Sequence, residues 1–581
     1  MDRLYDHSAK EVQRIIDRLI ERNLSDSSNL AEEWAEVAKQ SAYIHWIDQI
    51  EIKYPEIAMI ATGNYQHLTE ELKELLQKKQ SLTIDLLQNQ MHQMIAEVKA
   101  DNPKAVKDMI YQTGKKRQLW PVRRLVNEFA LNGLLDVIPV WLVSPEIASA
   151  IFPLEEKIFD LVIFDEASQC TVENGMPSIY RGNKVVVAGD EQQLPPSSLF
   201  KGSVDSDEEE EQEEFEESQS LLNLAKRILP SSLLEWHYRS KSEELINFSN
   251  HAFYHGHMQI APNVNHLQDP AAIQWHESNG RWINQQNSVE AEDVVKLLKQ
   301  KLIEDASKTI GIITFNAKQQ AAIEDAIDRH SEEDAEFAVI YDQVMSRDLD
   351  ERIFVKNIEN VQGDERHIII FSIAYAKNKE GKVYNRFGTL GQEGGENRLN
   401  VAVTRAKQEI HLIASIEPHE LNVTNAKNIG PKLLKAYMEY AQAVSDLKKD
   451  SIEATLTNLS GGEVNTQTQE GSLQFDSPFE EEVYEKLTEI GYSVDTQVGM
   501  SGYRIDLAVV DPNDPSKYVL GIECDGAMYH SSPAARERDI YRQRFLESKG
   551  WKIERVWSRN WWKDPFGEIE RIDRVVKELN S

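Results

Sequence analysis

Short apolar runs alternate with helix-like stretches through the middle of the chain. Leu161–Phe164 is a continuous apolar run, the pattern of a strand buried on both faces of a parallel sheet, and Lys184–Ala188 is predicted as another short buried strand. After residue 219 the alternation begins again, with helical stretches at 219–228 and 240–253. The strands and helices expected after these are the strand Ile310–Phe315, the helix Ala317–Arg329, the strand His367–Tyr375, a helix opening at Leu399–Thr404 and the strand Ile410–Ser415. Buried strands separated by helices predict a doubly wound parallel sheet in each of two α/β units.

The two ends of the chain have different patterns. Leu68–Leu76 and Leu82–Leu87 have apolar spacing near 3.6, which predicts long amphipathic helices arranged as an antiparallel pair. Near the C-terminus a helix is expected to open at Pro478, with Asp476 or Ser477 as its N-cap. The strands Ile505–Val510 and Tyr518–Gly526 should follow, joined by a turn at Asn513–Pro515.

Composition describes a soluble globular protein, with 41% hydrophobic and 28% charged residues among 581. No apolar run reaches the roughly 18 residues of a membrane span, and the N-terminus lacks a signal-peptide layout. The two cysteines, Cys170 and Cys524, imply no disulfide framework, which suits a cytoplasmic protein. The net charge of −33 speaks only weakly against a nucleic-acid partner, because ten of the acids are concentrated in residues 205–217.

Two carboxylates follow the first buried strand directly. Asp165 and Glu166 stand at the carboxyl end of a parallel strand, where open α/β sheets place their chemistry. Asp165 suits a Mg²⁺ ligand and Glu166 suits the residue that orients the water attacking a γ-phosphate. The alternative interpretation is a strand that ends in two solvated acids.

Five short motifs extend this pattern along the chain. The motifs are Asp165-Glu166-Ala167-Ser168-Gln169, Gly189-Asp190-x-x-Gln193-Leu194-Pro195-Pro196, His237-Tyr238-Arg239-Ser240, Val361-Gln362-Gly363-Asp364-Glu365 and Val401-Ala402-Val403-Thr404-Arg405-Ala406-Lys407. Their order and spacing resemble those of superfamily 1 helicases, and most closely the Upf-type branch.

The resemblance implies a role in nucleotide binding and hydrolysis for seven residues. They are Asp165 on Mg²⁺, Glu166 on the attacking water, Gln193 as sensor of the γ-phosphate, Arg239 and Arg405 as arginine fingers, and Gly363 and Glu365 in the loop that couples nucleotide state to strand contact. A surface salt bridge is the alternative role for either arginine.

One part that the resemblance requires has no counterpart upstream of Asp165. ATP binding in this family depends on a Gly-rich loop ending in Gly-Lys-Ser/Thr, the Walker A motif. Gly63 is followed by Asn64, and Gly114-Lys115-Lys116 lacks the hydroxyl residue. We therefore expect little or no ATPase from this chain alone. ATP becomes a cofactor only if a missing N-terminal segment, or a second polypeptide carrying the Walker A half, supplies the loop.

The C-terminal strands carry a second group of acids. Glu523 and Asp525 are two residues apart on a strand, so they point to one face, and Asp506 on the neighbouring strand can complete a carboxylate pocket. Oxygen ligands of this kind suit Mg²⁺ or Mn²⁺, and His530 is placed to carry a proton during phosphodiester cleavage. The alternative is a packed hairpin with stray acids.

Residues 536–563 hold nine bases and four acids, interleaved with Trp551, Trp557, Trp561 and Trp562, a mixture that suits a nucleic-acid surface. The alternative places these tryptophans in the core. Residues 475–565 resemble the restriction-endonuclease-like fold, in its Vsr-like branch. The resemblance implies that Asp506, Glu523 and Asp525 are metal ligands, with an acid from Glu480–Glu482, His530 and Gln543 as accessory groups. Asp525 stands where that fold commonly has Lys, which leaves the general base open.

The expected fold class is α/β, with a RecA-like helicase core, a helical N-terminal region and a C-terminal restriction-endonuclease-like domain. The expected domains are a helical region (1–135), the remainder of the first RecA-like domain (136–203), an acidic disordered loop (204–218), the second RecA-like domain (219–445), a linker (446–474) and a Vsr-like nuclease domain (475–581).

The leading functional expectation is a helicase–nuclease component that cleaves DNA with Mg²⁺ through its C-terminal domain, in DNA repair or phage defence. The alternatives are a non-catalytic DNA-binding or split-helicase subunit, and an RNA-acting helicase fragment.

Overall fold

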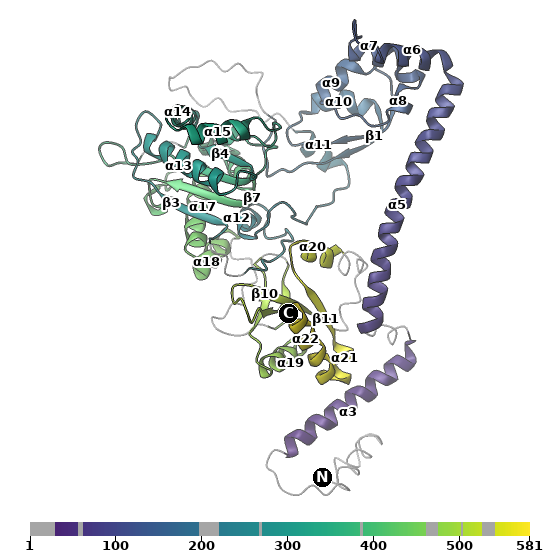
Figure 1. Cartoon of the computed structure of the whole chain (residues 1–581), viewed down its shortest axis with the longest axis vertical. Coiled ribbons are helices and arrows are strands. Elements are labelled where there is room, and N and C mark those ends of the chain that lie inside the picture. The colour runs from purple at the N-terminus through teal and green to yellow at the C-terminus, as the bar shows by residue number, and fades with distance from the viewer. Residues whose placement is uncertain are drawn as a thin grey trace. The chain divides into compact units, whose positions relative to one another are not determined.

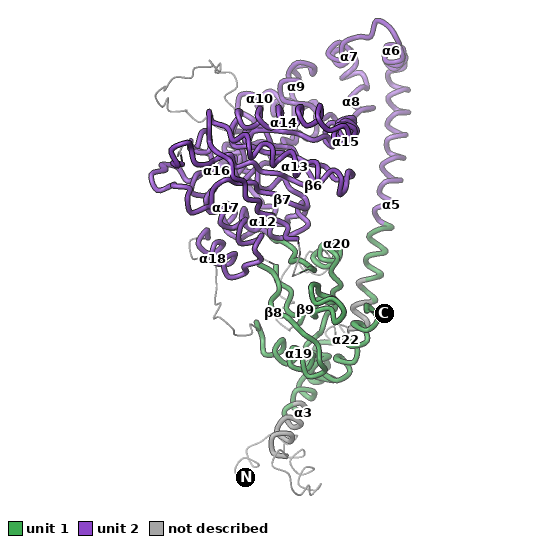
Figure 2. The backbone as a smooth tube through the Cα atoms, turned by 60° about the vertical axis from the view of Figure 1, so that its left-hand side comes forward, with its two compact units in different colours: residues 1–78, 259–269, 467–581 green, residues 79–258, 270–466 purple. Residues whose placement is uncertain are grey.

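The computed structural model of the chain describes residues 30–55, 62–196, 220–265, 270–383, 387–460, 475–500, 503–525 and 541–580. The chain divides into two compact units, coloured in Figure 2. Unit 1 consists of residues 1–78, 259–269 and 467–581, and unit 2 of residues 79–258 and 270–466. The predicted acidic loop (204–218) lies outside the described residues.

A single helix replaces the predicted antiparallel pair. Helix α5 runs unbroken from Thr62 to Asp101, as Figure 1 shows. The prediction of two helices was wrong because Gln77–Ser81, between the two apolar runs, contains neither Gly nor Pro to end a helix. Short helices follow: α6 (Pro103–Thr113), α7 (Val122–Phe129), η1 (Ala130–Asn132), α8 (Leu134–Val137) and α9 (Pro145–Ile151).

The strand before Asp165 forms as predicted but is less buried than expected. Strands β1 (Phe159–Phe164) and β2 (Gly182–Val187) form a parallel two-stranded sheet connected by helix α10 (Val172–Tyr180). Leu161 and Ile163 are 47% and 63% exposed, so burial on both faces was wrong. A crossover helix covers one face of a two-stranded sheet, and the described residues provide no second layer.

The second half of unit 2 is a complete parallel sheet, as predicted. Its five strands are arranged in the order β3-β7-β6-β4-β5, and every pair is parallel. The strands are β3 (Ile273–Glu277), β4 (Ile310–Thr314), β5 (Phe354–Asn357), β6 (Arg366–Ser372) and β7 (Ala406–Ala414).

Helices cover both faces of this sheet (Figure 1). Helices α13 (Ser288–Glu304), α14 (Ala317–Glu333) and α15 (Ala335–Met345) share one apolar core with the strands. Helices α12 (Glu244–Phe253) and α17 (Gly430–Ser445) contact the sheet through β7 and β3. The remaining elements of the unit are α11 (Leu221–Ile228), η2 (Ile358–Asn360), η3 (Gly388–Gly391), α16 (Gly395–Val403), η4 (Pro418–Glu420) and α18 (Lys449–Leu459), the last lying inside the predicted linker.

Unit 1 is built on a mixed four-stranded sheet in the order β11-β10-β9-β8. Strands β8 (Val494–Val498), β9 (Ile505–Val510) and β10 (Tyr518–Asp525) pair antiparallel, whereas β11 (Ile553–Trp557) runs parallel to β10. The helices are α19 (Pro478–Glu489), α20 (Gln543–Ser548), α21 (Ser558–Lys563) and α22 (Pro565–Leu579). Ser477 caps α19, its side chain accepting the Glu480 N–H, which confirms that N-cap prediction.

Two segments that are distant in sequence from residues 475–581 also belong to this unit. Helix α3 (Leu30–Lys53) contacts α21. The segment 259–265 pairs with the sheet, because the Tyr518 N–H donates to the Val264 carbonyl at 2.9 Å and the Trp551 indole donates to the Pro262 carbonyl at 2.8 Å. The domain predicted at 475–581 therefore draws on residues well outside that range.

No helix among the described residues combines the length and the hydropathy needed to cross a bilayer.

Candidate functional site

Asp165 and Glu166 lie directly after β1, in an exposed turn. Glu166 has a φ of +52°, a left-handed conformation that is uncommon for a residue with a Cβ and that concentrates at functional sites. The Asp165 carboxylate accepts the Glu166 N–H at 3.0 Å. The Ala167 N–H donates to Ala188 at the end of β2, so the two strand ends are held together. The turn therefore presents both carboxylates to solvent on a fixed backbone.

Glu166 and Gln193 meet a residue from the second α/β half. The Gln362 amide donates to Glu166 Oε2 at 2.9 Å and to Gln193 Oε1 at 3.4 Å. Gly363 follows with a φ of +84°, a conformation for which glycine is suited. The motif around Gln362 thus reaches the two acceptors predicted to face the γ-phosphate. Gln362 was quoted in its motif but assigned no role from sequence.

The two predicted arginine fingers lie near each other and near the same acids. Arg405 is buried, and its Nε donates to the Val401 carbonyl at 2.7 Å. Burial, and then the charge of Arg239, lower the pKa of Arg405 to about 10, while Glu166 and Glu365 oppose the shift. Arg239 pairs with Glu365 at 2.9 Å, so its guanidinium is anchored beside the loop. Lys407 and Arg239 together hold the pKa of Glu365 below its usual range.

A second set of contacts between the same two halves was not predicted. The Tyr254 hydroxyl donates to Asp190 Oδ2 at 2.6 Å, and burial raises the pKa of this phenol well above its usual range. Asn400 donates to the Tyr254 hydroxyl at 3.0 Å and to the Gln192 carbonyl at 2.8 Å. Asn397 donates to the Gln193 carbonyl at 3.0 Å. These contacts orient the Gly189–Pro196 loop, and nothing in the local sequence of the partners marks them.

In unit 1, three acids come together around the β9–β10 pair. Leu507 and Ile522 are register partners, which places Asp506 beside Glu523. Glu480 on α19 contributes a third carboxylate. Burial, and then the charges of Glu523 and Glu480, raise the pKa of Asp506 well above its usual range. The Cys524 N–H donates to Asp506 at 2.7 Å, a contact that opposes the shift. The predicted pairing of Asp506 and Glu523 is present in the structure.

Asp525 faces a cation instead. Arg555 on β11 donates to Asp525 Oδ2 at 3.2 Å, and both side chains are buried. Glu523 accepts from the Tyr503 hydroxyl at 3.2 Å and lies 3.5 Å from the Arg542 guanidinium. Among the described residues, no group of three or more His, Cys, Asp or Glu side chains is arranged to hold a metal ion. His530, the predicted proton carrier, lies outside the described residues.

The tryptophans of the C-terminal region mostly build its core. Trp551, Trp557 and Trp561 are at most 5% exposed, so the expectation that they interleave with bases on a nucleic-acid surface was wrong for these three. Trp557 is the last residue of the edge strand β11, and Trp561 of α21 belongs to the apolar core of the domain. Trp562 is half-buried.

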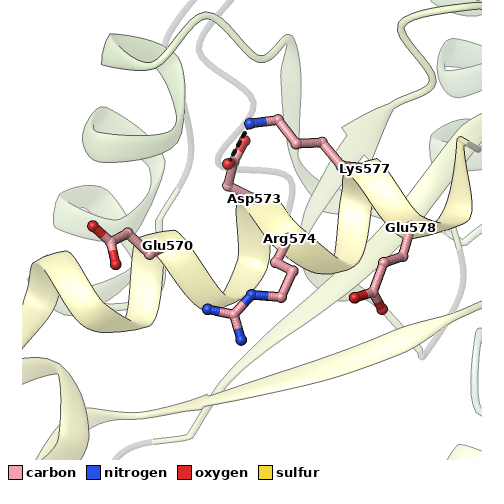
Figure 3. Close-up of a pocket in the computed structure, with 5 residues that line it drawn as sticks. All are labelled: Glu570, Asp573, Arg574, Lys577 and Glu578. Atoms are coloured by element: carbon pink, nitrogen blue, oxygen red, sulfur yellow. Dashed lines mark hydrogen bonds and ion pairs between the residues drawn. The ribbon is translucent and has the colours of Figure 1, made fainter.

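A shallow hollow on α22 does not form part of either site. Figure 3 shows its lining, Glu570, Asp573, Arg574, Lys577 and Glu578, which comes from one helix. Asp573 and Lys577 pair at 2.6 Å one turn apart. The hollow is the charged outer face of an amphipathic helix, and none of its residues is a predicted site residue.

Comparisons with known families divide the chain into three regions. One AAA domain family (AAA_11) matches residues 10–199, and a second (AAA_12) matches residues 215–417. The family REase_MTES_1575 matches residues 479–576. The first two regions contain the five motifs, and the third contains Asp506 and Glu523.

Several relatives of this chain are named as helicases. The chain is 33% identical over 488 residues to an uncharacterized ATP-dependent helicase, the MG140 homolog of Mycoplasma pneumoniae, and 31% identical over 489 residues to MG140 of Mycoplasma genitalium. Each match covers 80% of this chain and 42% of the relative. A DNA replication ATP-dependent helicase/nuclease, DNA2 of Gallus gallus, is 24% identical over 303 residues, covering 49% of this chain and 26% of that protein.

The three family matches follow one another along the chain in the same order as the three sheets, and the first two matches contain the five motifs in order. The chain therefore carries the helicase domains of the Upf-type branch of superfamily 1, followed by a C-terminal restriction-endonuclease-like domain.

Proposed function

We propose that this chain is the nuclease-bearing part of a helicase that processes DNA, and that its C-terminal domain cleaves phosphodiesters with a divalent metal ion. The observation that carries this proposal is the pairing of Asp506 with Glu523 at the centre of the restriction-endonuclease-like domain. Burial and the neighbouring acids raise the pKa of Asp506. A bound cation would offset that repulsion, which is the electrostatic signature of a metal site.

The donor set fits Mg²⁺ or Mn²⁺. These ions are commonly held by one or two carboxylates together with water and substrate phosphate. Asp506 and Glu523 would hold the ion, and it would supply activation of water against the phosphodiester. Glu480 accepts hydrogen bonds from the Ser477 hydroxyl at 2.9 Å and the Gln497 amide at 3.1 Å, so it is better placed to orient the site than to bind the ion.

The test uses the full chain with single-stranded, nicked, flapped and mismatched DNA, and with RNA of matched sequence. We expect the wild type to cleave DNA in the presence of Mg²⁺ or Mn²⁺, and Asp506→Asn to lose this cleavage. The same variant should also lose Mn²⁺ binding, measured by electron paramagnetic resonance. Asp511→Asn, which alters an acid just after the end of the same strand, is the matched control. Absence of cleavage on every DNA substrate, or cleavage that survives Asp506→Asn, would refute the proposal.

For the helicase region we propose nucleotide-dependent action only when a phosphate loop from outside residues 1–581 completes the site. Glu166, Gln193 and Arg405 would then surround the γ-phosphate, with Gln362 linking the first two. The expected result is ATPase in a mixture with the polypeptide that carries the loop, and a much lower rate for Glu166→Gln in the same mixture. ATP turnover at about 1 s⁻¹ or faster by the chain alone, a typical lower bound for an enzyme, would contradict this part.

A second function, nucleic-acid binding without cleavage, is favoured by one observation. Glu523 and Asp525 already contact the cationic side chains of Arg542 and Arg555, which could satisfy both acids permanently. This function predicts tight DNA binding that is unaffected by Mn²⁺ and by Asp506→Asn. The metal-binding measurement therefore separates the two functions.

A further inference from the structure

Helix α21 carries two bases on one face. Arg559 and Lys563 are four residues apart, so their side chains lie side by side on the helix surface. Trp561, on the opposite side, is 1% exposed and its indole donates to Glu482 at 3.1 Å. The helix is therefore fixed in the domain by its apolar side, with the bases directed outward.

This basic face adjoins the edge of the sheet where the candidate nuclease site lies. Strands β10 and β11 are parallel, so their carboxyl ends lie at the same edge, and Asp525 is the register partner of Trp557. Helix α21 begins at the next residue, Ser558. A nucleic-acid strand held by Arg559 and Lys563 would therefore run beside the strand end that carries Glu523.

Acids from helix α3 occupy this face. Glu51 pairs with Arg559, and it also pairs with Lys563 at 3.1 Å. Asp48 pairs with Lys563 at 3.3 Å. Among the described residues, these two α3 acids are the ion-pair partners of Arg559 and Lys563. Arg559 and Lys563 in turn hold the pKa of Glu51 below its usual range.

Among the described side chains of α3, ion pairs provide most of the contacts with α21. Tyr43 adds an aromatic contact with Trp562, with ring centroids 5.2 Å apart. Trp46 and Ile52, which are 65% and 74% exposed, take little part in packing. Ion pairs at a surface are weak and are screened by salt, so a polyanion at high local concentration can replace them.

We propose that the α21 face formed by Arg559 and Lys563 is a binding surface for the DNA phosphate backbone, and that Glu51 and Asp48 of α3 occupy it in place of phosphates. This inference rests on the proposed function, since it assigns a substrate surface to the nuclease domain. The α3 acids would leave when DNA binds, so α3 limits access to that edge of the domain.

The test measures binding of a short fluorescein-labelled DNA duplex to the full chain by anisotropy. Excess EDTA prevents cleavage, so the result is independent of whether the domain is a nuclease. We expect Asp48→Asn/Glu51→Gln to bind several-fold more tightly at low salt. Two freed phosphate contacts should also make its affinity fall about tenfold more than that of the wild type between roughly 50 and 200 mM salt.

Two further variants control for net charge and for the surface itself. Glu71→Gln/Glu74→Gln removes the same charge from exposed positions of α5 and should leave binding near the wild-type level. Adding Arg559→Gln/Lys563→Gln to the α3 variant should abolish the increase in its DNA affinity over the wild type. Equal binding by the two acid-neutralised variants, or a gain that survives loss of both bases, would overturn the inference. Tighter DNA binding by the α3 variant than by the α5 variant, measured in EDTA, supports the inference even if no cleavage is found with metal.

Discussion

Glu290 provides a quantitative test of the electrostatics in the second helicase lobe. It lies in the first turn of α13 and is fully buried. Its carboxylate accepts hydrogen bonds from the Ser372 hydroxyl at 2.8 Å, the Ala374 N–H at 2.6 Å, the Ser415 hydroxyl at 3.0 Å and the Asn287 amide at 3.1 Å. Burial raises the pKa of Glu290 to about 7, although these donors favour the ionised form.

The direction of the pH dependence follows from this shift. The folded lobe keeps the Glu290 proton to higher pH than the unfolded chain does, so the contribution of Glu290 to the free energy of unfolding decreases as pH rises. With the folded pKa near 7 and the unfolded value at 4.5, the loss between pH 5 and pH 8 is about 2.5 kcal/mol. Glu290→Gln has no titrating group there, so the variant should lack this loss.

Hydrogen exchange in the full chain measures the effect locally. Peptides from β6 and β7 report the free energy of opening of the sheet, and comparing variants at each pH cancels the intrinsic exchange rate. Glu277→Gln, which alters an exposed glutamate of the same lobe, is the matched control and should follow the wild type. A constant difference between wild type and Glu290→Gln across this pH range would refute the reasoning, because the four donors would then hold Glu290 ionised.

Three other predictions concern packing and buried polar contacts, and each can be checked by thermal or urea unfolding followed with local probes. Arg555→Leu removes the guanidinium that pairs with the buried Asp525 carboxylate and should destabilise unit 1 by about 3–5 kcal/mol, with part of the loss recovered when Asp525 is also replaced by Asn. Gly311→Ala places a Cβ 2.4 Å from the Phe354 ring and should cost about 1–3 kcal/mol, and an unchanged stability would contradict the close packing of β4 on β5. Tyr254→Phe removes a half-buried hydrogen-bond donor and should destabilise the contact between the two helicase lobes by about 1 kcal/mol, measured as faster exchange in α12.

Much of the α/β architecture could be predicted because apolar runs of strand length are distinctive. The strands predicted to begin at Ile310, His367 and Ile410 all lie within a few residues of their observed bounds. Strands β3 and β5 were not predicted, because each is only four or five residues long and contains polar side chains such as Gln274 and Lys356. Periodicity alone cannot distinguish such segments from loops.

The sites illustrate the same limit. Neighbours along one motif, such as Asp165 and Glu166, could be assigned from sequence, and so could the pairing of Asp506 with Glu523 across adjacent strands. The partners from distant elements could not. Arg555 faces Asp525 only because β11 returns parallel to β10, an arrangement that no local pattern specifies.

The segment 259–265 has a consequence for how the protein is made. Pro262 and its donor Trp551 are separated by 289 positions, and synthesis at roughly 5–20 residues per second places about 15–60 s between their appearance. Ala261 is buried in the finished unit against residues between Tyr503 and Trp551, which have not yet been synthesised when Ala261 appears. The nuclease-like unit can therefore reach its final packing only after the sequence of the second helicase lobe has been synthesised.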